Sequence, residues 1–139
     1  MLGRAVPVTP IATSCWSVPA TAAAVGDLRT AVCAFASDAG LPDPPLADVR
    51  LAVSEAVTNV VLHGYRDDAE PGPVEIDAEL DEHELRLVVA DRGVGMQPRG
   101  HSPGAGFGLP LIAAIADAHE IRARRPHGTE LHLSFRVSG

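Results

Sequence analysis

The stretch Leu51-Ala-Val-Ser-Glu-Ala-Val-Thr-Asn-Val-Val-Leu-His-Gly-Tyr65 combines a helical apolar pattern with a few polar residues. Apolar residues in it and just before it follow the i, i+3, i+4, i+7 spacing of an amphipathic helix, at Val49, Ala52, Val53, Ala56, Val57, Val60 and Val61. This pattern predicts a helix over about residues 46–62 that ends at Gly64. We expect its apolar face to pack on the core of the domain.

The polar residues of this helix form one stripe. Glu55, Asn59 and His63 are spaced i, i+4, i+8, at the edge of the apolar arc, which places them on the rim of a cleft. A carboxylate and a carboxamide one turn apart offer oxygen ligands for Mg²⁺, and the carboxylate can serve as a general base. The alternative is a polar helix rim, with Asn59 bonded to a neighbouring loop and His63 acting as a C-terminal helix cation.

Two glycine-rich segments follow. Asp91-Arg-Gly-Val-Gly-Met96 comes directly after an apolar run, where an acid can accept a hydrogen bond from an exocyclic amine such as that of adenine. Gly93 and Gly95 allow the backbone to approach a flat ring, although a simple turn is the alternative. Gly104-Ala-Gly-Phe-Gly-Leu109 precedes a predicted helix, whose N-terminal N–H groups favour phosphate, although a flexible loop is the alternative. Thr129, after Gly128, can help Asp91 hold an adenine.

The order of predicted elements indicates the fold class. Strands are expected at 11–18, 74–80, 85–90, 121–125 and 129–137, and helices at about 22–38, 46–62 and 109–118. Hairpins with helices between them favour an α+β two-layer sandwich over a βαβ repeat. Residues 1–10, broken by prolines, are expected to be a flexible N-terminus, and residues 11–139 a single domain.

The composition excludes several functions. The chain has 139 residues and a net charge of −7, and all 11 basic residues are arginine. Because the chain has no lysine, a lysine Schiff base and a Walker-type phosphate loop are excluded. The lack of a basic face disfavours a nucleic-acid binder. We expect no membrane span and no secretory signal, and we expect Cys15 and Cys33 to be buried free thiols in a reducing cytosol.

Four motifs, taken in order, resemble those of the GHKL ATPase superfamily. They are E-x3-N on a helix, D-x-G-x-G after a strand, G-x-G-x-G-L before a helix and a final G-T. The likeness spans about Leu51 to Val137, and Leu51–Tyr65 resembles most the RsbW/SpoIIAB group of anti-sigma factors that are also serine-protein kinases. The resemblance implies a Bergerat-type ATP-binding fold, with a mixed, mainly antiparallel sheet covered by helices on one face.

The resemblance also implies residue roles, with ATP and Mg²⁺ as cofactors. Glu55 is implied as the general base that takes the proton of the attacking serine hydroxyl, and Asn59 as the Mg²⁺ ligand. The other implied nucleotide-binding residues are Asp91 on the adenine amine with Gly93, Gly95 and Thr129 beside it, and Gly104, Gly106, Gly108 and Leu109 around the phosphates. Arg92 stands where asparagine is frequent, and the segment between Gly95 and Gly104 is short for a lid. Arg99 is the candidate for the γ-phosphate role that a lysine plays in some members.

The implied partners are a STAS-type anti-anti-sigma factor as substrate and a sigma factor that the kinase sequesters, in the cytoplasm and without direct contact to nucleic acid or membrane. A homodimer is compatible with the resemblance. Two alternatives stay open: an ATP-binding regulatory module that sequesters a partner without phosphotransfer, and a stand-alone histidine kinase-like ATPase domain. A sensor histidine kinase is expected to need further dimerisation helices, and a gyrase- or MutL-like ATPase a transducer domain.

Overall fold

The structure is a computed structural model that describes residues 9–66, 68–94 and 109–137. Its elements follow one another as strand β1 (Ala12–Pro19), helices α1 (Ala22–Asp38) and α2 (Pro45–Asn59), the π-helical turn η1 (Val60–Gly64), strands β2 (Pro73–Leu80) and β3 (Glu84–Asp91), helix α3 (Leu109–Ile115), and strands β4 (Ala118–Ala123) and β5 (Thr129–Arg136). Of the predicted flexible N-terminus, residues 1–8 lie outside this range. Within it, no helix is long and apolar enough to span a membrane.

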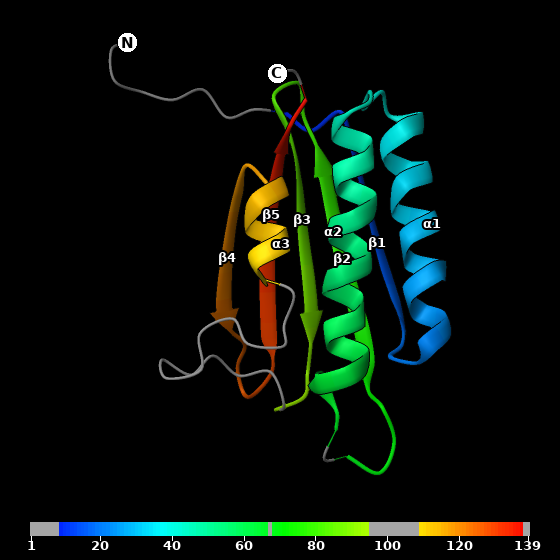
Figure 1. Cartoon of the computed structure of the whole chain (residues 1–139), viewed down its shortest axis with the longest axis vertical. Helices are drawn as coiled ribbons and strands as arrows, with labels where there is room; N and C mark the ends of the chain where they lie inside the picture. The colour runs from blue at the N-terminus through cyan, green and yellow to red at the C-terminus, as the bar shows by residue number, and fades with distance from the viewer. Residues whose placement is uncertain (1–8, 67, 95–108, 138–139) are drawn as a thin grey trace.

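The strands form one sheet in the order β1-β2-β3-β5-β4, and each described pairing is antiparallel. The helices lie together on one face of this sheet (Figure 1). The predicted α+β two-layer sandwich is therefore confirmed. β3 lies in the middle of the sheet, so its last residues lie between the ends of β2 and β5.

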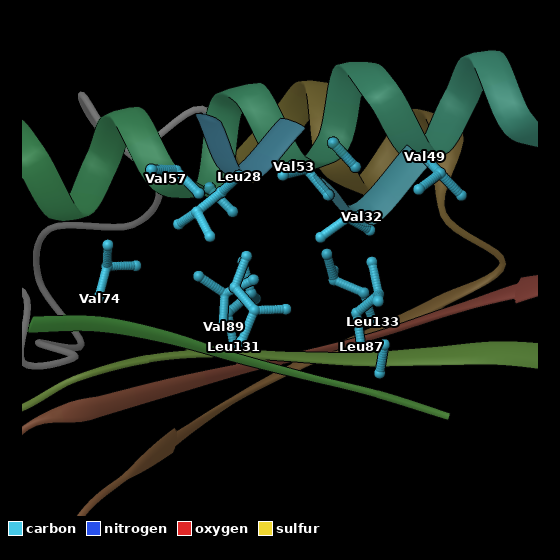
Figure 2. Close-up of a cluster of buried hydrophobic side chains, with 14 of the residues drawn as sticks. Leu28, Val32, Val49, Val53, Val57, Val74, Leu87, Val89, Leu131 and Leu133 are labelled. Carbon is cyan, nitrogen blue, oxygen red and sulfur yellow. The ribbon is translucent and has the colours of Figure 1, made fainter. Parts of the chain in front are cut away.

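The core fills the space between the two layers. Alternate residues of β2, β3 and β5 point toward the helices because side chains along a strand alternate between its faces. Side chains of α2 and α1 meet them from the other layer (Figure 2), among them Val49, Val53, Val57, Leu28 and Val32, each at most 1% exposed. Burial of this apolar surface is the main force that holds helices and sheet together. At the β1 edge, Trp16 and Phe35 of α1 add an edge-to-face contact with ring centroids 5.8 Å apart.

Four local predictions need correction. α2 ends at Asn59 and continues as a π turn rather than running on to residue 62. β4 begins at Ala118 rather than residue 121, because Ala118 already pairs with Ser134 of β5, and α3 accordingly ends at Ile115. Cys33 is buried as expected, but Cys15 is exposed because it lies on the face of β1 that points away from the helices.

Candidate functional site

Asp91, the last residue of β3, is a buried carboxylate, only 1% exposed. Its Oδ1 accepts the backbone N–H of Gly93 at 2.9 Å, and the backbone of Thr129, which faces it across the β3–β5 pairing, also hydrogen-bonds to it. Burial raises the pKa of the carboxyl, while the bond from Gly93, the charge of Arg124 and the bond from Thr129 partly offset that rise. The structure thus brings together Asp91, Gly93 and Thr129, as the sequence predicts, around a single ionisable acceptor.

Glycines pack the backbone tightly around this carboxylate. A Cβ added at Gly93 would lie 1.8 Å from the carbonyl oxygen of Gly64, so only glycine fits where the two loops touch. Gly128 has φ of +123°, and a Cβ there would lie 2.2 Å from the carbonyl oxygen of Asp91. Both close approaches hold the turns that flank Asp91 against it.

The predicted polar stripe on α2 runs along the helix toward the end of the sheet where Asp91 lies. Glu55 and His63 are half-buried, while Asn59, the last residue of α2, is only 4% exposed. The π turn carries the chain from Asn59 to Gly64, where an added Cβ would lie 3.5 Å from the Cγ of Asp91. π turns are frequent at functional sites, and this one connects the helix stripe to the carboxylate.

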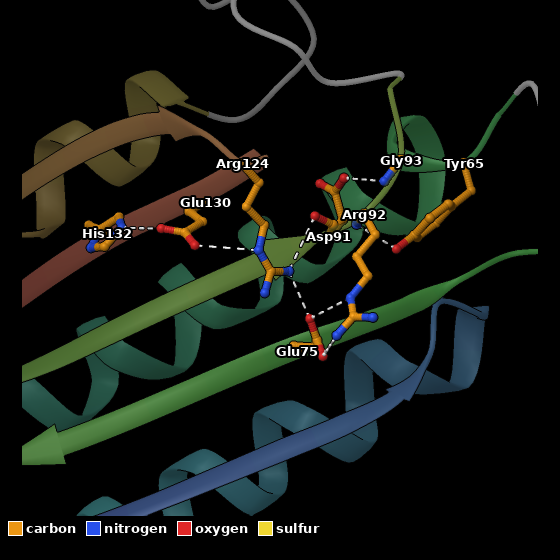
Figure 3. A network of polar contacts seen from close by, with 8 residues as sticks. All are labelled: Tyr65, Glu75, Asp91, Arg92, Gly93, Arg124, Glu130 and His132. Atoms are coloured by element: carbon orange, nitrogen blue, oxygen red, sulfur yellow. Dashed lines mark hydrogen bonds and ion pairs between the residues drawn. The ribbon is translucent and has the colours of Figure 1, made fainter. Parts of the chain in front are cut away.

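A polar network that the sequence analysis missed surrounds the end of β3 (Figure 3). The hydroxyl of Tyr65 donates to the carbonyl of Pro73 at 2.6 Å and accepts the backbone N–H of Arg92 at 2.8 Å. The guanidinium of Arg92 lies 3.0 Å from Glu75, on the neighbouring strand β2.

Arg124 completes this network from the turn between β4 and β5. It donates to the Oε1 of Glu75 at 2.7 Å and lies 3.5 Å from the carbonyl oxygen of Asp91. The bond from Arg124 is the main reason that the pKa of Glu75 lies below its usual range. Strand alternation places Glu75 on the open face of the sheet, but no sequence pattern shows which arginines meet there.

The remaining predicted residues are placed only in part. Leu109 is the first residue of α3 and is half-buried. Gly95, Gly104, Gly106 and Gly108, together with Arg99, lie outside the described residues. Among the residues that the structure describes, no group of three or more His, Cys, Asp or Glu side chains is placed to hold a metal. Mg²⁺ usually takes only one or two protein oxygens beside substrate phosphates and waters, and the side chain of Asn59 carries an amide oxygen.

The open face of the sheet carries a shallow hollow of about 1,030 Å³, away from these residues. Charged pairs occupy much of its lining, among them Arg86 with Glu79 and Arg122 with Glu120. None of the predicted site residues lines it. We therefore place the candidate site at the end of β3 and α2, where the buried carboxylate lies, and not in the hollow.

Comparison with known proteins gives the class to which this fold and site belong. The model of the histidine kinase-like ATPase domain family matches residues 18–135, which include the described helices and nearly all of β2, β3, β4 and β5, but only the last two residues of β1. The chain therefore belongs to the histidine kinase-like ATPase domain family.

Similar individual proteins are anti-sigma factors. The chain is 33% identical over 114 residues to the anti-sigma F factor of Clostridium beijerinckii. This alignment covers 74% of the chain and 79% of the relative. It is 32% identical over 116 residues to the anti-sigma F factor of Pasteuria penetrans, covering 76% of this chain and 77% of the relative.

Among solved structures, the RsbU and RsbW domains of Rv1364c from Mycobacterium tuberculosis match with a TM-score of 0.71 and 26% identity. The match covers 90% of this chain and 32% of that one, so the chain spans about a third of the crystallised protein.

Proposed function

We propose that the chain is a Mg-ATP-dependent serine-protein kinase that phosphorylates a STAS-type anti-anti-sigma factor and that also acts as an anti-sigma factor. The observation that carries this proposal is the buried Asp91, held by Gly93 and Thr129 beside the end of the helix that bears Glu55 and Asn59. Membership of the ATPase family and the likeness to anti-sigma F factors support it.

Asp91 is the residue that recognises the base. As a carboxylate it is a pure hydrogen-bond acceptor, and the 6-amino group of adenine is a donor. Guanine presents a carbonyl oxygen at the same position, which a carboxylate repels, so the site favours ATP over GTP. Burial strengthens this preference, because an unsatisfied charge in a buried site is costly. Gly93 and Gly95 let the backbone lie close to the ring.

Asn59 and Glu55 act at the other end of the nucleotide. The amide oxygen of Asn59 would hold Mg²⁺, whose charge would neutralise the phosphates. Glu55, one helical turn earlier and half-buried, would accept the proton of the serine hydroxyl. The serine oxygen would bond to the γ-phosphorus as the bond from that phosphorus to its bridging oxygen breaks, and ADP would leave. Gly104, Gly106, Gly108 and Leu109 complete the phosphate-binding segment before α3.

Phosphotransfer to a STAS-domain protein is the direct test of this proposal. The purified chain with Mg-ATP should produce phosphoserine on the cognate STAS protein. Glu55→Gln should abolish it while ATP affinity stays near that of the wild type, because the amide cannot take a proton. If the wild type binds ATP and the sigma factor but yields no phosphoserine, the chain is instead a binding module that sequesters its partner.

We also propose residues 11–139 as one ATP-binding domain that works in the cytoplasm. The single core that joins all three described helices to the sheet supports the domain assignment. Because the chain carries a net charge of −7, its effect on transcription runs through protein partners rather than DNA. Light scattering of the purified chain tests whether it forms a homodimer.

A further inference from the structure

We propose that Tyr65 is a positioning residue for the nucleotide site, and that its hydroxyl sets the turn that holds Asp91. This inference rests on the proposed function, in which Asp91 recognises the adenine base. Tyr65 follows the π turn directly and is only 9% exposed. Its hydroxyl contacts two backbone groups, one on Pro73 at the start of β2 and one on Arg92 just after the end of β3.

The pairing of β2 with β3 explains what the hydroxyl does. Val74 faces Asp91, so the next pair in this register would be Pro73 opposite Arg92. In place of a direct bond between that pair, the N–H of Arg92 donates to the hydroxyl of Tyr65 (Figure 3), and this hydroxyl donates to the carbonyl of Pro73. The hydroxyl is therefore inserted between the strands, and it ends the ladder directly after Asp91.

Ending the ladder there has a consequence for the carboxylate. Had Arg92 paired directly with Pro73, the chain would have continued along β2. Instead it turns toward Gly64, where Gly93 packs against the Gly64 carbonyl and donates its N–H to Asp91.

The ring of Tyr65 is fixed independently of its hydroxyl. A Cβ added at Gly72 would lie 2.6 Å from a carbon of the Tyr65 ring, and one at Gly93 would lie 3.0 Å from another. The ring thus packs closely against two glycines, one on each side of the β2–β3 pairing. Tyr65→Phe keeps this ring packing and removes only the two hydrogen bonds, so it isolates the positioning role.

The test compares Tyr65→Phe with Asp81→Asn, a matched control at the opposite end of the same hairpin. Asp81 also makes buried polar contacts, but these bind the turn between β2 and β3. We expect Tyr65→Phe to weaken ATP binding about tenfold and to narrow the preference for ATP over GTP. Asp81→Asn should lower the melting temperature without changing either quantity.

Amide hydrogen exchange measured by NMR gives a second readout that needs no nucleotide. In Tyr65→Phe the amides of Arg92 and Gly93 should exchange faster, while those in the middle of β3 keep the wild-type rate. The inference is overturned if these two amides and the ATP affinity both stay unchanged. It is also overturned if Asp81→Asn weakens ATP binding as much as Tyr65→Phe does. If the wild type binds no ATP, the proposed function fails, and amide exchange still decides whether Tyr65 positions the turn.

Discussion

Asp91 carries an ionisable carboxyl in a place that disfavours charge. Because burial raises its pKa, the folded protein binds a proton there more readily than the unfolded chain does. The contribution of Asp91 to stability therefore falls as the pH rises from its unfolded pKa through its folded one. The ionised form of this carboxyl therefore costs stability, and the proposed role in adenine recognition gives a reason for that cost.

Asp91→Asn should consequently weaken nucleotide binding without lowering the thermal stability of the fold. The amide oxygen can still accept the N–H of Gly93, so the melting temperature at pH 7 should be no lower than that of the wild type. Adenine affinity should fall at least tenfold, because an amide is a weaker acceptor than a carboxylate. Thermal unfolding and titration with ATP and GTP check this. Equal ATP and GTP affinities in the wild type would contradict the assignment of Asp91 to the base.

Individual residues were predictable where a local motif defines them. The placement of Asp91 at a strand end next to glycines follows from the D-x-G-x-G pattern. The family resemblance implied that Thr129 lies beside Asp91, but no sequence pattern showed that β3 and β5 are neighbours. Tyr65 was not predictable, because its role depends on where the β2–β3 pairing stops. The hydroxyl of Tyr65 ends that pairing by bonding to Pro73 and Arg92, which only the folded hairpin brings together.

At the scale of elements, the β2–β3 hairpin is held by a charged cluster in its turn. Asp81 is 2% exposed; its Oδ1 accepts the N–H groups of His83 and Glu84 at 2.7 and 2.9 Å, and its Oδ2 accepts from Arg86 at 2.7 Å. The bond from Arg86 is the main cause that lowers the pKa of Asp81 from 3.8 to about 2. Arg86 also pairs with Glu79 and Glu84, so one guanidinium joins three carboxylates.

This cluster predicts a defined pH dependence. Since the folded pKa of Asp81 is depressed, its stabilising effect is complete above pH 3.8 and is lost as the pH falls toward about 2. Asp81→Asn should be less stable than the wild type at pH 6, and the gap in urea midpoint should shrink at pH 3. A gap that stays constant between these pH values would show that the carboxylate charge is not what stabilises the turn.

The turn before β5 depends on a glycine. Gly128→Ala would place a methyl group against the Asp91 carbonyl at a positive φ, and we expect a loss of roughly 1–3 kcal/mol in stability. Chemical denaturation measures this loss, with Gly26→Ala in α1 as the control. A Cβ at Gly26 meets nothing closer than 3.6 Å, so that substitution should stabilise the helix. Similar effects of the two substitutions would contradict the proposed strain.

The elements themselves were largely predictable, and their ends were not. The apolar periodicity of α2 and the alternation of β2 and β5 give those elements within a few residues. β4 was misplaced because most of its side chains are exposed, so it lacks the alternating apolar pattern that marks a half-buried strand. Pairing with β5 defines it instead.

At the scale of the whole molecule, one apolar core connects the sheet with the three described helices. A domain with a single core is expected to unfold in one cooperative transition, and a ligand that binds only the folded state raises its midpoint. Mg-ATP at a hundred times its Kd should add about 2.7 kcal/mol of stability.

Asn59→Ala should reduce this stabilisation to the level that ATP gives with a metal chelator, because the implied Mg²⁺ ligand is gone. Differential scanning calorimetry with and without Mg²⁺ measures both effects. A magnesium-dependent shift that persists in Asn59→Ala would rule out this residue as the ligand.

The fold class follows from the order of hairpins and helices in the sequence. The sheet order β1-β2-β3-β5-β4 does not, because long-range contacts decide which strands are neighbours.

Because of the π turn, the number of residues between Asn59 and Tyr65 also affects the geometry of the site. Its hydrogen bonds span one residue more than those of an α-helix, so Val60–Gly64 uses an extra residue to reach the end of β3. A π turn takes up that residue locally, because it uses about one more residue for each turn than an α-helix does. An ordinary helix over the same five residues would carry Gly64 further around the axis, away from Asp91 and Gly93, even if every side chain in the site were kept. The segment acts as a spacer whose residue count matters as much as its composition.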